Sequence, residues 1–210
     1  MENFDTEKFN KLLNTSKFGR NLIYFDSIGS TNDYSAELIK NTAISDLERL
    51  DGTLVLAEKQ TSGRGRFGRR WLSPGGGLWF SLIFMTNIRP KELPNLTLIA
   101  AFSISEALMD TYGIGIDIKW PNDLYYGEHK LGGILSELKK EGILQIIILG
   151  AGINVNIDDK TLGGLDNMAT SIQKILGIEA DRELIMAKIL DNFERSYNYF
   201  STTGDFKSLF

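Results

Sequence analysis

The sequence has no cysteine and only one histidine, His129, among its 210 residues. Without cysteine, disulfides, thiolate catalysis, iron–sulfur clusters and cysteine zinc sites are excluded. With one histidine, multi-histidine metal sites are excluded, and a Ser-His-Asp triad could form only through that residue. The chemistry must therefore depend on Lys, Arg, Asp, Glu, Ser, Thr and bound Mg²⁺, a set that suits phosphoryl or nucleotidyl transfer.

The sequence also lacks the marks of secreted, membrane and nucleic-acid-binding proteins. Met1–Lys8 is polar and acidic, so we expect no signal peptide. The longest apolar stretch, Ile146–Ile153, is far too short to span a membrane. A formal net charge of -4 argues against general nucleic-acid binding. The absence of cysteine fits a reducing cytoplasm, and we expect a cytoplasmic protein with no membrane or nucleic-acid partner.

The apolar pattern predicts an α+β fold in one domain, residues 1–210. Short strands joined by tight turns predict a mixed, largely antiparallel β-sheet flanked by helices, which we expect on one side of it. The expected helices are Phe4–Leu13, Ser30–Lys40, Pro94–Tyr112 and Asp181–Phe200. The expected strands are Leu22–Phe25, Thr53–Lys59, Leu78–Phe84, Ile116–Trp120, Leu124–Tyr126, Lys130–Leu138 and Ile143–Leu149.

Positive charge and glycine are concentrated in one segment of this acidic chain. Lys59–Arg70 carries five positive charges and no negative one, and Gly63–Gly77 holds six of the 21 glycines. Glycine lets backbone N–H groups approach a ligand closely, and arginine donates hydrogen bonds to carboxylate or phosphate in a fork. The segment is therefore typical of a loop that binds an anion.

The letters GRGRFG at Gly63–Gly68 match a dinucleotide-binding fingerprint, which requires a strand before it and a helix after it. The strand at Thr53–Lys59 is expected, but the run Ser73–Gly77 (SPGGG) excludes the helix. Two interpretations remain open. The segment is either a disordered basic surface loop or a loop that is mobile when free and closes over a ligand.

Three other segments each have a structural and a functional interpretation. Ser30, with Asp33 three residues on, forms a capping-box pattern, but a helix N-terminus can equally hold a polar ligand group. Lys119 alternates with Ile118 and Trp120, which predicts that it points away from their face. Its charge lies either on the rim with a packed stem or inside a cleft. Gly150–Asn154 is either an ordinary loop or a ligand wall.

These segments occur in a fixed order that resembles one family, the biotin protein ligases. The resemblance covers about Tyr24–Asn156, most of the chain. It rests on Ser30-Thr31-Asn32, on Gln60 with GRGR at Gly63–Arg66 and Trp71, on KWPND at Lys119–Asp123, on KLGGIL at Lys130–Leu135, and on GAGIN at Gly150–Asn154.

The resemblance implies a two-step reaction. Biotin and ATP with Mg²⁺ would give biotinyl-5′-adenylate and pyrophosphate, and a lysine ε-amine on a biotin-accepting carboxylase subunit (a biotin carboxyl carrier domain) would then take the biotin. Lys119, Arg64 and Arg66 would be the catalytic cations. The substrate-binding residues would be Ser30, Thr31, Asn32, Gln60, Gly63, Arg64, Gly65, Arg66, Trp71, Lys119, Leu131, Gly132, Gly133, Ile134 and Asn154.

The chain departs from the family pattern at both ends. About twenty residues precede Leu22, too few for the DNA-binding domain of some members, and the small C-terminal β-barrel of many members is expected to be absent or truncated. The alternatives are a lipoate–protein ligase and a non-catalytic biotin-binding or regulatory module. The metal-binding residues, the acceptor's identity and the oligomeric state, a homodimer included, are left open by the sequence.

Overall fold

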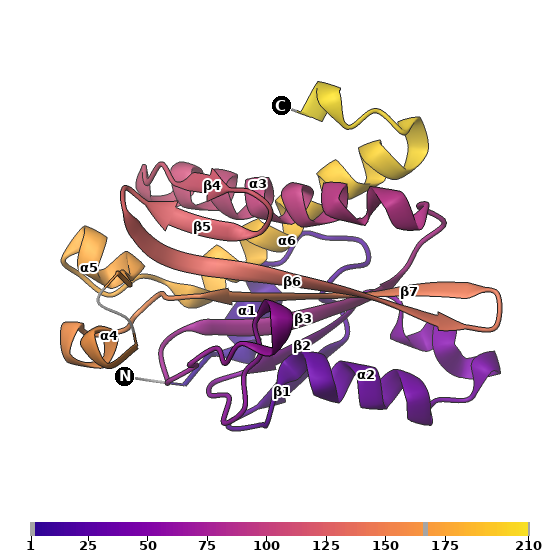
Figure 1. Cartoon of the computed structure of the whole chain (residues 1–210), viewed down its shortest axis with the longest axis horizontal. Helices are drawn as coiled ribbons and strands as arrows, with labels where there is room; N and C mark the ends of the chain where they lie inside the picture. Colours follow the sequence, from indigo (N-terminus) through magenta and orange to yellow (C-terminus); the bar gives the residue numbers. More distant parts are fainter. Residues whose placement is uncertain (1–2, 166–167, 210) are drawn as a thin grey trace.

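The structure, a computed structural model, describes residues 3–165 and 168–209. Its centre is a seven-stranded sheet in the order β1-β2-β3-β7-β6-β5-β4 (Figure 1). The β1–β2 pair is parallel, and the other neighbouring pairs are antiparallel. This confirms the predicted α+β class. The strands are β1 Leu22–Phe25, β2 Thr53–Ala57, β3 Leu78–Met85, β4 Asp117–Lys119, β5 Asp123–Tyr126, β6 His129–Glu141 and β7 Leu144–Ile153.

Helices cover both faces of the sheet. α1 (Thr6–Leu12), α3 (Leu93–Tyr112) and α6 (Arg182–Thr203) pack on one face, and α2 (Thr31–Asn41) lies on the other (Figure 1). The prediction of helices on one side was therefore wrong. The remaining helices are η1 Ile44–Leu50, η2 Arg66–Gly68, η3 Pro90–Glu92, α4 Asp159–Leu165, α5 Ile172–Leu176 and η4 Lys207–Leu209.

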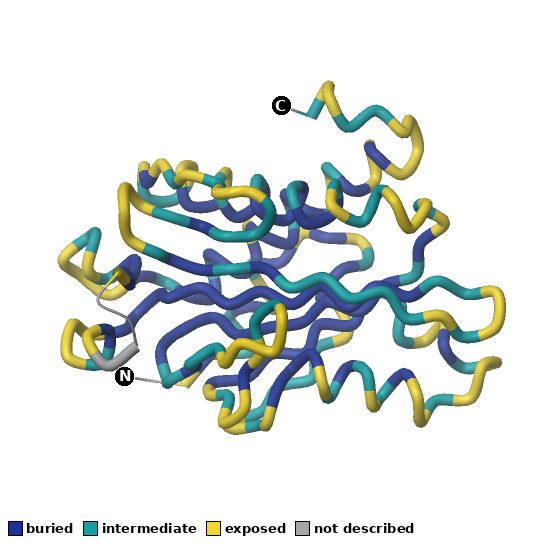
Figure 2. Tube along the Cα trace, viewed as in Figure 1, coloured by how far each residue is buried: buried dark blue, intermediate teal, exposed yellow. Residues whose placement is uncertain are grey.

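The reason for the two-sided arrangement is the pleat of the central strands. Successive residues of a strand point to opposite faces. In β2, Leu54 and Leu56 therefore join the core under α3 and α6, whereas Val55 joins a second cluster under α2. Figure 2 shows the result, with buried residues along the central strands and exposed residues along the outer helix surfaces and the β6–β7 turn.

One predicted strand ends earlier than expected. Ile116 and Ile118 pack against the main core, as their alternation predicts. Trp120 does not share their face, because it lies in the turn between β4 and β5 and is 75% exposed. Trp120 therefore belongs to the turn that follows β4, and it does not continue the strand's alternation.

A cluster of aromatic rings joins the N-terminal segment to the sheet and to α6. Phe18 lies with its ring centroid 5.4 Å from those of Phe84 and Phe193, and Tyr197 lies 5.1 Å from Phe84. Large buried rings in tilted or edge-on contact contribute strongly to the stability of a core. The cluster thereby anchors the segment that precedes β1.

The carboxylate of Glu194 on α6 holds the same segment from outside the core. It accepts hydrogen bonds from the backbone N–H groups of Ser16 at 2.6 Å, Lys17 at 2.8 Å and Phe18 at 3.0 Å. Burial alone would raise the pKa of Glu194, but these bonds stabilise the ionised form and lower the pKa below its ordinary value.

The lowered pKa of Glu194 predicts a pH-dependent effect of Glu194→Gln. A carboxylate whose pKa falls on folding stabilises the protein above its unfolded pKa of about 4.3, and this stability is lost as the pH falls through the folded value. We expect Glu194→Gln to reduce the free energy of unfolding by about 1–2 kcal/mol at pH 7, because charge-assisted hydrogen bonds are lost. Urea unfolding at pH 7 and pH 3.5 checks this, and a difference that stays the same at both pH values would contradict it.

Candidate active site

A cavity of about 360 Å³ opens between the basic loop, the N-terminus of α2 and the middle of the sheet. The loop, residues 59–77, connects β2 to β3 and contains the short helix η2. It folds on itself through backbone hydrogen bonds from Gly65 to Arg69 at 2.7 Å and from Trp71 to Gly63 at 2.8 Å. The cavity is therefore enclosed by segments far apart in the sequence. The predicted mobility of the loop without ligand stays a prediction.

Glycines of β7 form the floor of the cavity. The predicted strand end at Leu149 was wrong, because β7 continues to Ile153 and pairs there with both β3 and β6. A Cβ atom on Gly150 would lie 2.0 Å from Oδ1 of Asn32, and one on Gly152 would lie 2.5 Å from Nε1 of Trp71. Glycine in a central strand therefore leaves the space that these two side chains occupy.

One end of the cavity has a fixed pattern of hydrogen-bond donors and acceptors around Gln60. Its Oε1 atom accepts from the backbone N–H of Thr31 at 2.8 Å and from Oγ1 of Thr31 at 3.2 Å. Its Nε2 atom donates to Oγ of Ser73 at 2.8 Å. Ser30 is the N-cap of α2, as predicted, and accepts from the backbone N–H of Asp33 at 3.3 Å.

Asn32 is oriented in the same way. Its Oδ1 atom accepts a hydrogen bond from Oγ of Ser81 at 2.6 Å, and its Nδ2 atom donates to Oε2 of Glu137 at 3.1 Å. In both residues the amide oxygen accepts a hydrogen bond and the amide nitrogen donates one. Neither Gln60 nor Asn32 can therefore turn its amide over without losing hydrogen bonds. This end of the cavity therefore presents fixed neutral dipoles to a ligand.

Cations surround the middle of the cavity. Nη1 of Arg66 donates to Oδ1 of Asn122 at 3.0 Å, and Nζ of Lys130 lies 2.8 Å from Oδ1 of Asp123. Nζ of Lys130 is also 5.3 Å from the centre of the Trp71 ring. Arg69 and Arg70 add two further arginines to the lining. Positive charge in a partly enclosed site favours the binding of an anion.

Arg64 is paired with two carboxylates, whereas Lys130 is paired with one and Arg66 faces a neutral amide. The Nη2 atom of Arg64 lies 2.5 Å from Oδ1 of Asp33 and 3.4 Å from Oε2 of Glu137. Burial alone would lower the pKa of Arg64, but the hydrogen bond to Asp33 and the negative charge of Glu137 raise it above its usual value. The second residue of the predicted capping pattern, Asp33, thus pairs with the loop.

Two buried polar atoms of the cavity lining make no hydrogen bond to the residues that the structure describes. Among the described side chains, Nε1 of Trp71 and Oδ1 of Asn154 are buried without a hydrogen bond. Nδ2 of Asn154 donates to the backbone oxygen of Thr170 at 2.9 Å, which fixes the amide with its oxygen free. A buried polar atom without a partner is costly, so these two atoms mark places for a ligand's donor and acceptor groups.

Most of the residues predicted for the site line this cavity. They are Ser30, Thr31, Asn32, Gln60, Arg64, Gly65, Arg66, Trp71, Gly133, Ile134 and Asn154. Of the other predicted residues, Leu131 is fully buried in the main core, because it points to the opposite face of β6 from Lys130. A Cβ on Gly132 would lie 2.6 Å from the backbone oxygen of Gly152, and one on Gly63 would lie 2.5 Å from that of Trp71, so both glycines permit close backbone packing.

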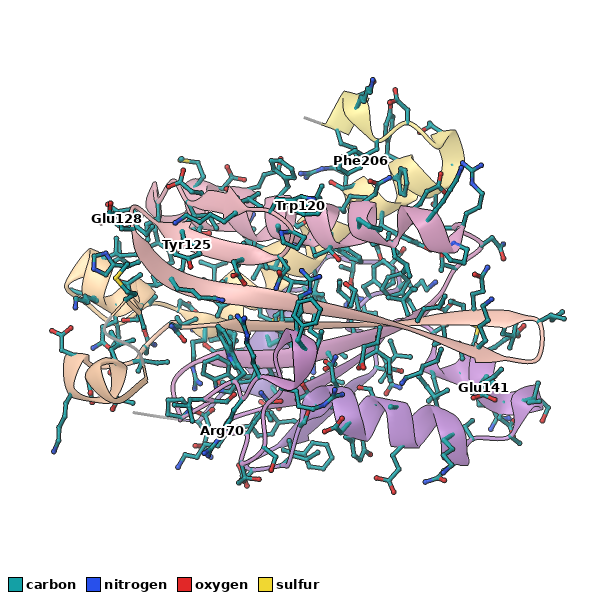
Figure 3. All side chains as sticks on the ribbon, viewed as in Figure 1. Arg70, Trp120, Tyr125, Glu128, Glu141 and Phe206 are labelled. Carbon is teal, nitrogen blue, oxygen red and sulfur yellow. The ribbon has the colours of Figure 1, made fainter. Side chains whose placement is uncertain are left out.

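Lys119 also lies outside the lining of the cavity. It is exposed, and its Nζ atom is 3.7 Å from the centre of the Tyr125 ring. In Figure 3, Tyr125 and Trp120 lie on one side of the β6 ribbon, and Arg70 of the basic loop lies on the other. Lys119 is nevertheless paired in register with Asp123, a lining residue. It therefore stands at the rim of the cavity.

Several lining residues were not singled out from the sequence. Asn122 and Asp123 belong to the KWPND segment, and Lys130 begins the KLGGIL segment. The signal was present, since all three residues are polar and stand beside or within predicted strands. The pairing of these two strands was expected, but their irregular register, which brings Asp123 and Lys130 together, could not be read from the sequence.

Neither a cluster of metal ligands nor a membrane-spanning helix occurs in the part of the chain that the structure describes. No group of three or more His, Cys, Asp or Glu side chains that could hold a metal ion occurs within residues 3–165 and 168–209. Within the same ranges, no helix is both long and apolar enough to cross a membrane. The chemical capacity of the site is therefore that of a cavity with fixed dipoles at one end, cations in the middle, and a free amide oxygen beside an indole.

Comparison with known proteins finds relatives that are named as ligases. Bifunctional ligase/repressor BirA of Bacillus subtilis (strain 168) is 40% identical over 195 residues, which cover 91% of this chain and 58% of that protein. Biotin–protein ligase 2 of Arabidopsis thaliana is 28% identical over 214 residues, with 98% and 61% covered. The chain thus spans little more than half the length of these relatives.

Solved structures give the same answer. The biotin protein ligase from Aquifex aeolicus in complex with biotin and ATP matches with a TM-score of 0.72 and 36% identity, covering 90% of this chain and 75% of that chain. P. falciparum LipL1 in complex with lipoate matches with a TM-score of 0.56 and 15% identity, a likeness of fold alone. The family profile described as "Biotin/lipoate A/B protein ligase family" matches residues 24–154. The chain therefore belongs to the biotin/lipoate A/B protein ligase family.

Proposed function

We propose that the chain joins biotin to ATP, giving biotinyl-5′-adenylate and pyrophosphate, and then transfers biotin to a lysine of a biotin-accepting carboxylase subunit. The observation that carries the proposal is the order of groups in the cavity, with fixed neutral dipoles at one end and cations in the middle. A relative named as a biotin–protein ligase, and a solved neighbour in complex with biotin and ATP, support it.

The neutral end of the cavity suits the ureido ring of biotin. That ring has one carbonyl acceptor and two N–H donors, and it is uncharged. The Ser30–Asn32 segment and Gln60 offer hydroxyl, amide and backbone groups whose orientation is already fixed. Because the partners need no reorganisation, ring binding costs little ordering entropy.

The cations suit the chemical step. A biotin carboxylate oxygen attacks the α-phosphorus of ATP, the new O–P bond forms, and the bond to pyrophosphate breaks. Two anions must approach each other, and positive charge at Arg66 and Lys130 offsets their repulsion and stabilises the pentavalent transition state. The fold suits Mg²⁺ bound with ATP, because Mg²⁺ needs few protein ligands beside the phosphates and the carboxylate of Asp123 lines the cavity.

The far end of the cavity suits the adenine ring. The free Oδ1 atom of Asn154 can accept a hydrogen bond from an exocyclic amino group, and the Trp71 ring offers a flat surface for stacking. Gly150 and Gly152 stand two residues apart on one face of β7, and Asn154 follows directly after the strand ends at Ile153. The cavity floor thus has an order of subsites that matches the order of groups in biotinyl-adenylate.

In the second step, an acceptor lysine attacks the acyl carbon of the adenylate, the amide bond forms, and AMP leaves. The step needs an adenylate that stays bound until the acceptor arrives, since a free acyl-adenylate hydrolyses. The basic loop covers the cavity and meets this need. We assign the acceptor to the class of biotin carboxyl carrier domains, in line with the family resemblance.

The lipoate alternative is disfavoured by the neutral end of the cavity. The dithiolane ring of lipoate has no hydrogen-bonding group, so it would displace water from the polar groups around Gln60 and Asn32 without replacing the hydrogen bonds of that water, and a polar site rejects such analogues strongly. A thermal-shift comparison of biotin and lipoate with ATP separates the two, and we expect stabilisation by biotin alone.

The decisive experiment is biotin-dependent exchange of radioactive pyrophosphate into ATP with Mg²⁺. We expect exchange with biotin and none without it, together with biotinyl-adenylate detected by mass. Exchange that requires lipoate instead of biotin would show that lipoate is the substrate. Biotin binding without any exchange would establish a non-catalytic biotin-binding module instead.

Lys119→Gln tests the residue to which the family resemblance assigns a catalytic positive charge. The long side chain starts opposite Asp123, so a rotation away from Tyr125 brings its charge to the anions. We expect adenylate formation to fall by about a hundredfold, as for the loss of one charge-stabilising donor. The free energy of unfolding should change by no more than about 1 kcal/mol, the value of an exposed cation–π contact. An unchanged rate of adenylate formation would mean that Lys119 has no catalytic role and is a rim residue whose aliphatic stem packs against its neighbours.

Arg66→Gly tests the loop as a clamp on the adenylate. Arg66 is bonded to the neutral side chain of Asn122 and so keeps a full charge for a phosphate. A charge-assisted hydrogen bond is worth about 1.5–3 kcal/mol, so release of the adenylate should accelerate by about ten- to a hundredfold. The released adenylate should biotinylate added albumin, while the parent protein does not. Normal adenylate formation without albumin labelling would show that Arg66 does not retain the intermediate.

A further inference from the structure

Arg64 joins the basic loop to two separate elements of the fold. Its Nη2 atom contacts Oδ1 of Asp33, in the first turn of α2, at 2.5 Å. The same atom contacts Oε2 of Glu137, on β6, at 3.4 Å. One guanidinium therefore bridges the loop, the helix that begins at the cavity and a strand of its wall.

The bridge extends to a residue of the cavity lining. Glu137 accepts a hydrogen bond from Nδ2 of Asn32 at 3.1 Å, and Ser81 donates to Oδ1 of Asn32 at 2.6 Å. Glu137 thereby orients both the loop arginine and the Asn32 amide. Neither Asp33 nor Glu137 lines the cavity among the described residues, so both act from outside it.

The two arginines of the GRGR segment have different electrostatic surroundings. Arg64 faces two carboxylates, which together more than balance its charge. Arg66 faces the neutral amide of Asn122. An anion entering the cavity can therefore draw on the charge of Arg66, whereas Arg64 could serve it only by giving up its carboxylate partners.

We propose that Arg64 is a positioning residue rather than a catalytic one, and that Asp33 and Glu137 fix the basic loop over the intermediate through it. The inference rests on the proposed function, because the intermediate is biotinyl-adenylate. It assigns a role to Asp33 and Glu137 that is separate from the chemistry: they slow the release of the intermediate and leave its formation unchanged.

The test compares Asp33→Asn, Glu137→Gln and the double variant with Glu106→Gln. Glu106 is a matched control, since it pairs with Arg195 at 3.2 Å on the surface. Adenylate is formed from biotin and ATP with Mg²⁺, and its rates of formation and of release are measured separately. Exposed ion pairs are weak, so we expect release about three- to tenfold faster in the double variant. Formation should stay within about twofold in every variant, because the amide oxygen that Glu137→Gln introduces can still accept the hydrogen bond of Asn32, and the control should match the parent.

A charge exchange separates positioning from general structural damage. Combining Asp33→Arg with Arg64→Asp places the cation on α2, between the two carboxylates, and should restore slow release better than either single change. If formation falls while release is unchanged, Arg64 serves the chemistry and the proposal is wrong. If release is unchanged in the double variant, or the exchange restores nothing, the ion pairs do not position the loop.

Trypsin cleavage tests the same idea without any ligand. The loop contains Arg66, Arg69 and Arg70, whose peptide bonds become accessible when the loop leaves the surface. We expect the Asp33→Asn and Glu137→Gln double variant to be cut there about three- to tenfold faster than the Glu106→Gln control. If the parent makes no adenylate, the proposed function fails, while this measurement still decides the role of the ion pairs. Equal cleavage would overturn the proposal.

Discussion

Lys130→Gln is expected to reduce the rate of biotinyl-adenylate formation by about a hundred- to a thousandfold. Lys130 lies inside the cavity, with its Nζ atom 2.8 Å from Oδ1 of Asp123 and 5.3 Å from the centre of the Trp71 ring. Removing the cation has two effects on the anionic transition state. The stabilising charge is lost, and the carboxylate of Asp123 is left to repel the phosphate.

The measurement is single-turnover adenylate formation with radioactive biotin at saturating ATP and Mg²⁺. Lys130→Arg keeps the positive charge and should recover part of the rate. Lys174→Gln is the matched control, since Lys174 pairs with Asp159 at 2.9 Å and neither residue is among the described residues that line the cavity, so this variant should form adenylate at the parent's rate. Formation by Lys130→Gln within about threefold of the parent's rate would contradict an electrostatic role at this position.

The parts of the fold that depend on local pattern were predicted well. The continuous apolar run of β3 and the strand Leu22–Phe25 appear as expected, as does the long helix that begins near Pro94. These elements follow from periodicity and from turn residues alone. The side of the sheet on which α2 packs could not be predicted, because it depends on which strands become neighbours.

The candidate site shows the same division. The five motif segments do meet at one cavity, but the pleat of each strand decides which of their residues face it. Leu131 and Lys130 are adjacent in the sequence, yet one lies in the core and the other in the cavity. Because the register between β5 and β6 is irregular at Leu124 and Tyr125, the sequence alone does not show which residues of these strands face the cavity. From the sequence, the glycines of β7 resembled a loop. The space beside them is filled by the side chains of Asn32 and Trp71, which come from distant segments and could not be assigned to that space from the sequence.

The basic loop has a buried ion pair at its base, and this pair leads to the largest expected effect on stability. Glu58 and Arg182 are 7% and 5% exposed, with Oε1 of Glu58 2.9 Å from Nη1 of Arg182. Glu58 immediately precedes the loop, and its Oε1 atom also accepts from the backbone N–H of Gly76 at 2.9 Å. Arg182 donates to the backbone oxygen of Gly77 at 3.3 Å. Both ends of the loop are thus tied to the start of α6.

Arg182→Met is expected to reduce the free energy of unfolding by about 3–5 kcal/mol, because it leaves the Glu58 carboxylate buried without its counter-charge. Glu58→Gln should have a similar effect, since it removes the negative charge that the buried guanidinium faces. The double variant should lose less than the sum of the two, because neither charge is then stranded. Arg195→Met, which breaks the exposed pair with Glu106, is the matched control and should cost no more than about 1 kcal/mol.

Urea unfolding of the four variants gives the coupling between Glu58 and Arg182 directly. A coupling near zero would mean that the two side chains contribute independently, and the loop would then be held by its backbone contacts alone. A large coupling has a consequence for the cavity, since Gln60 stands two residues after Glu58 and its amide orients the neutral end. The double variant, if it folds, should therefore bind biotin more weakly than the Arg195→Met control. Equal biotin affinity in the double variant and the control would show that the ion pair stabilises the fold without affecting biotin binding.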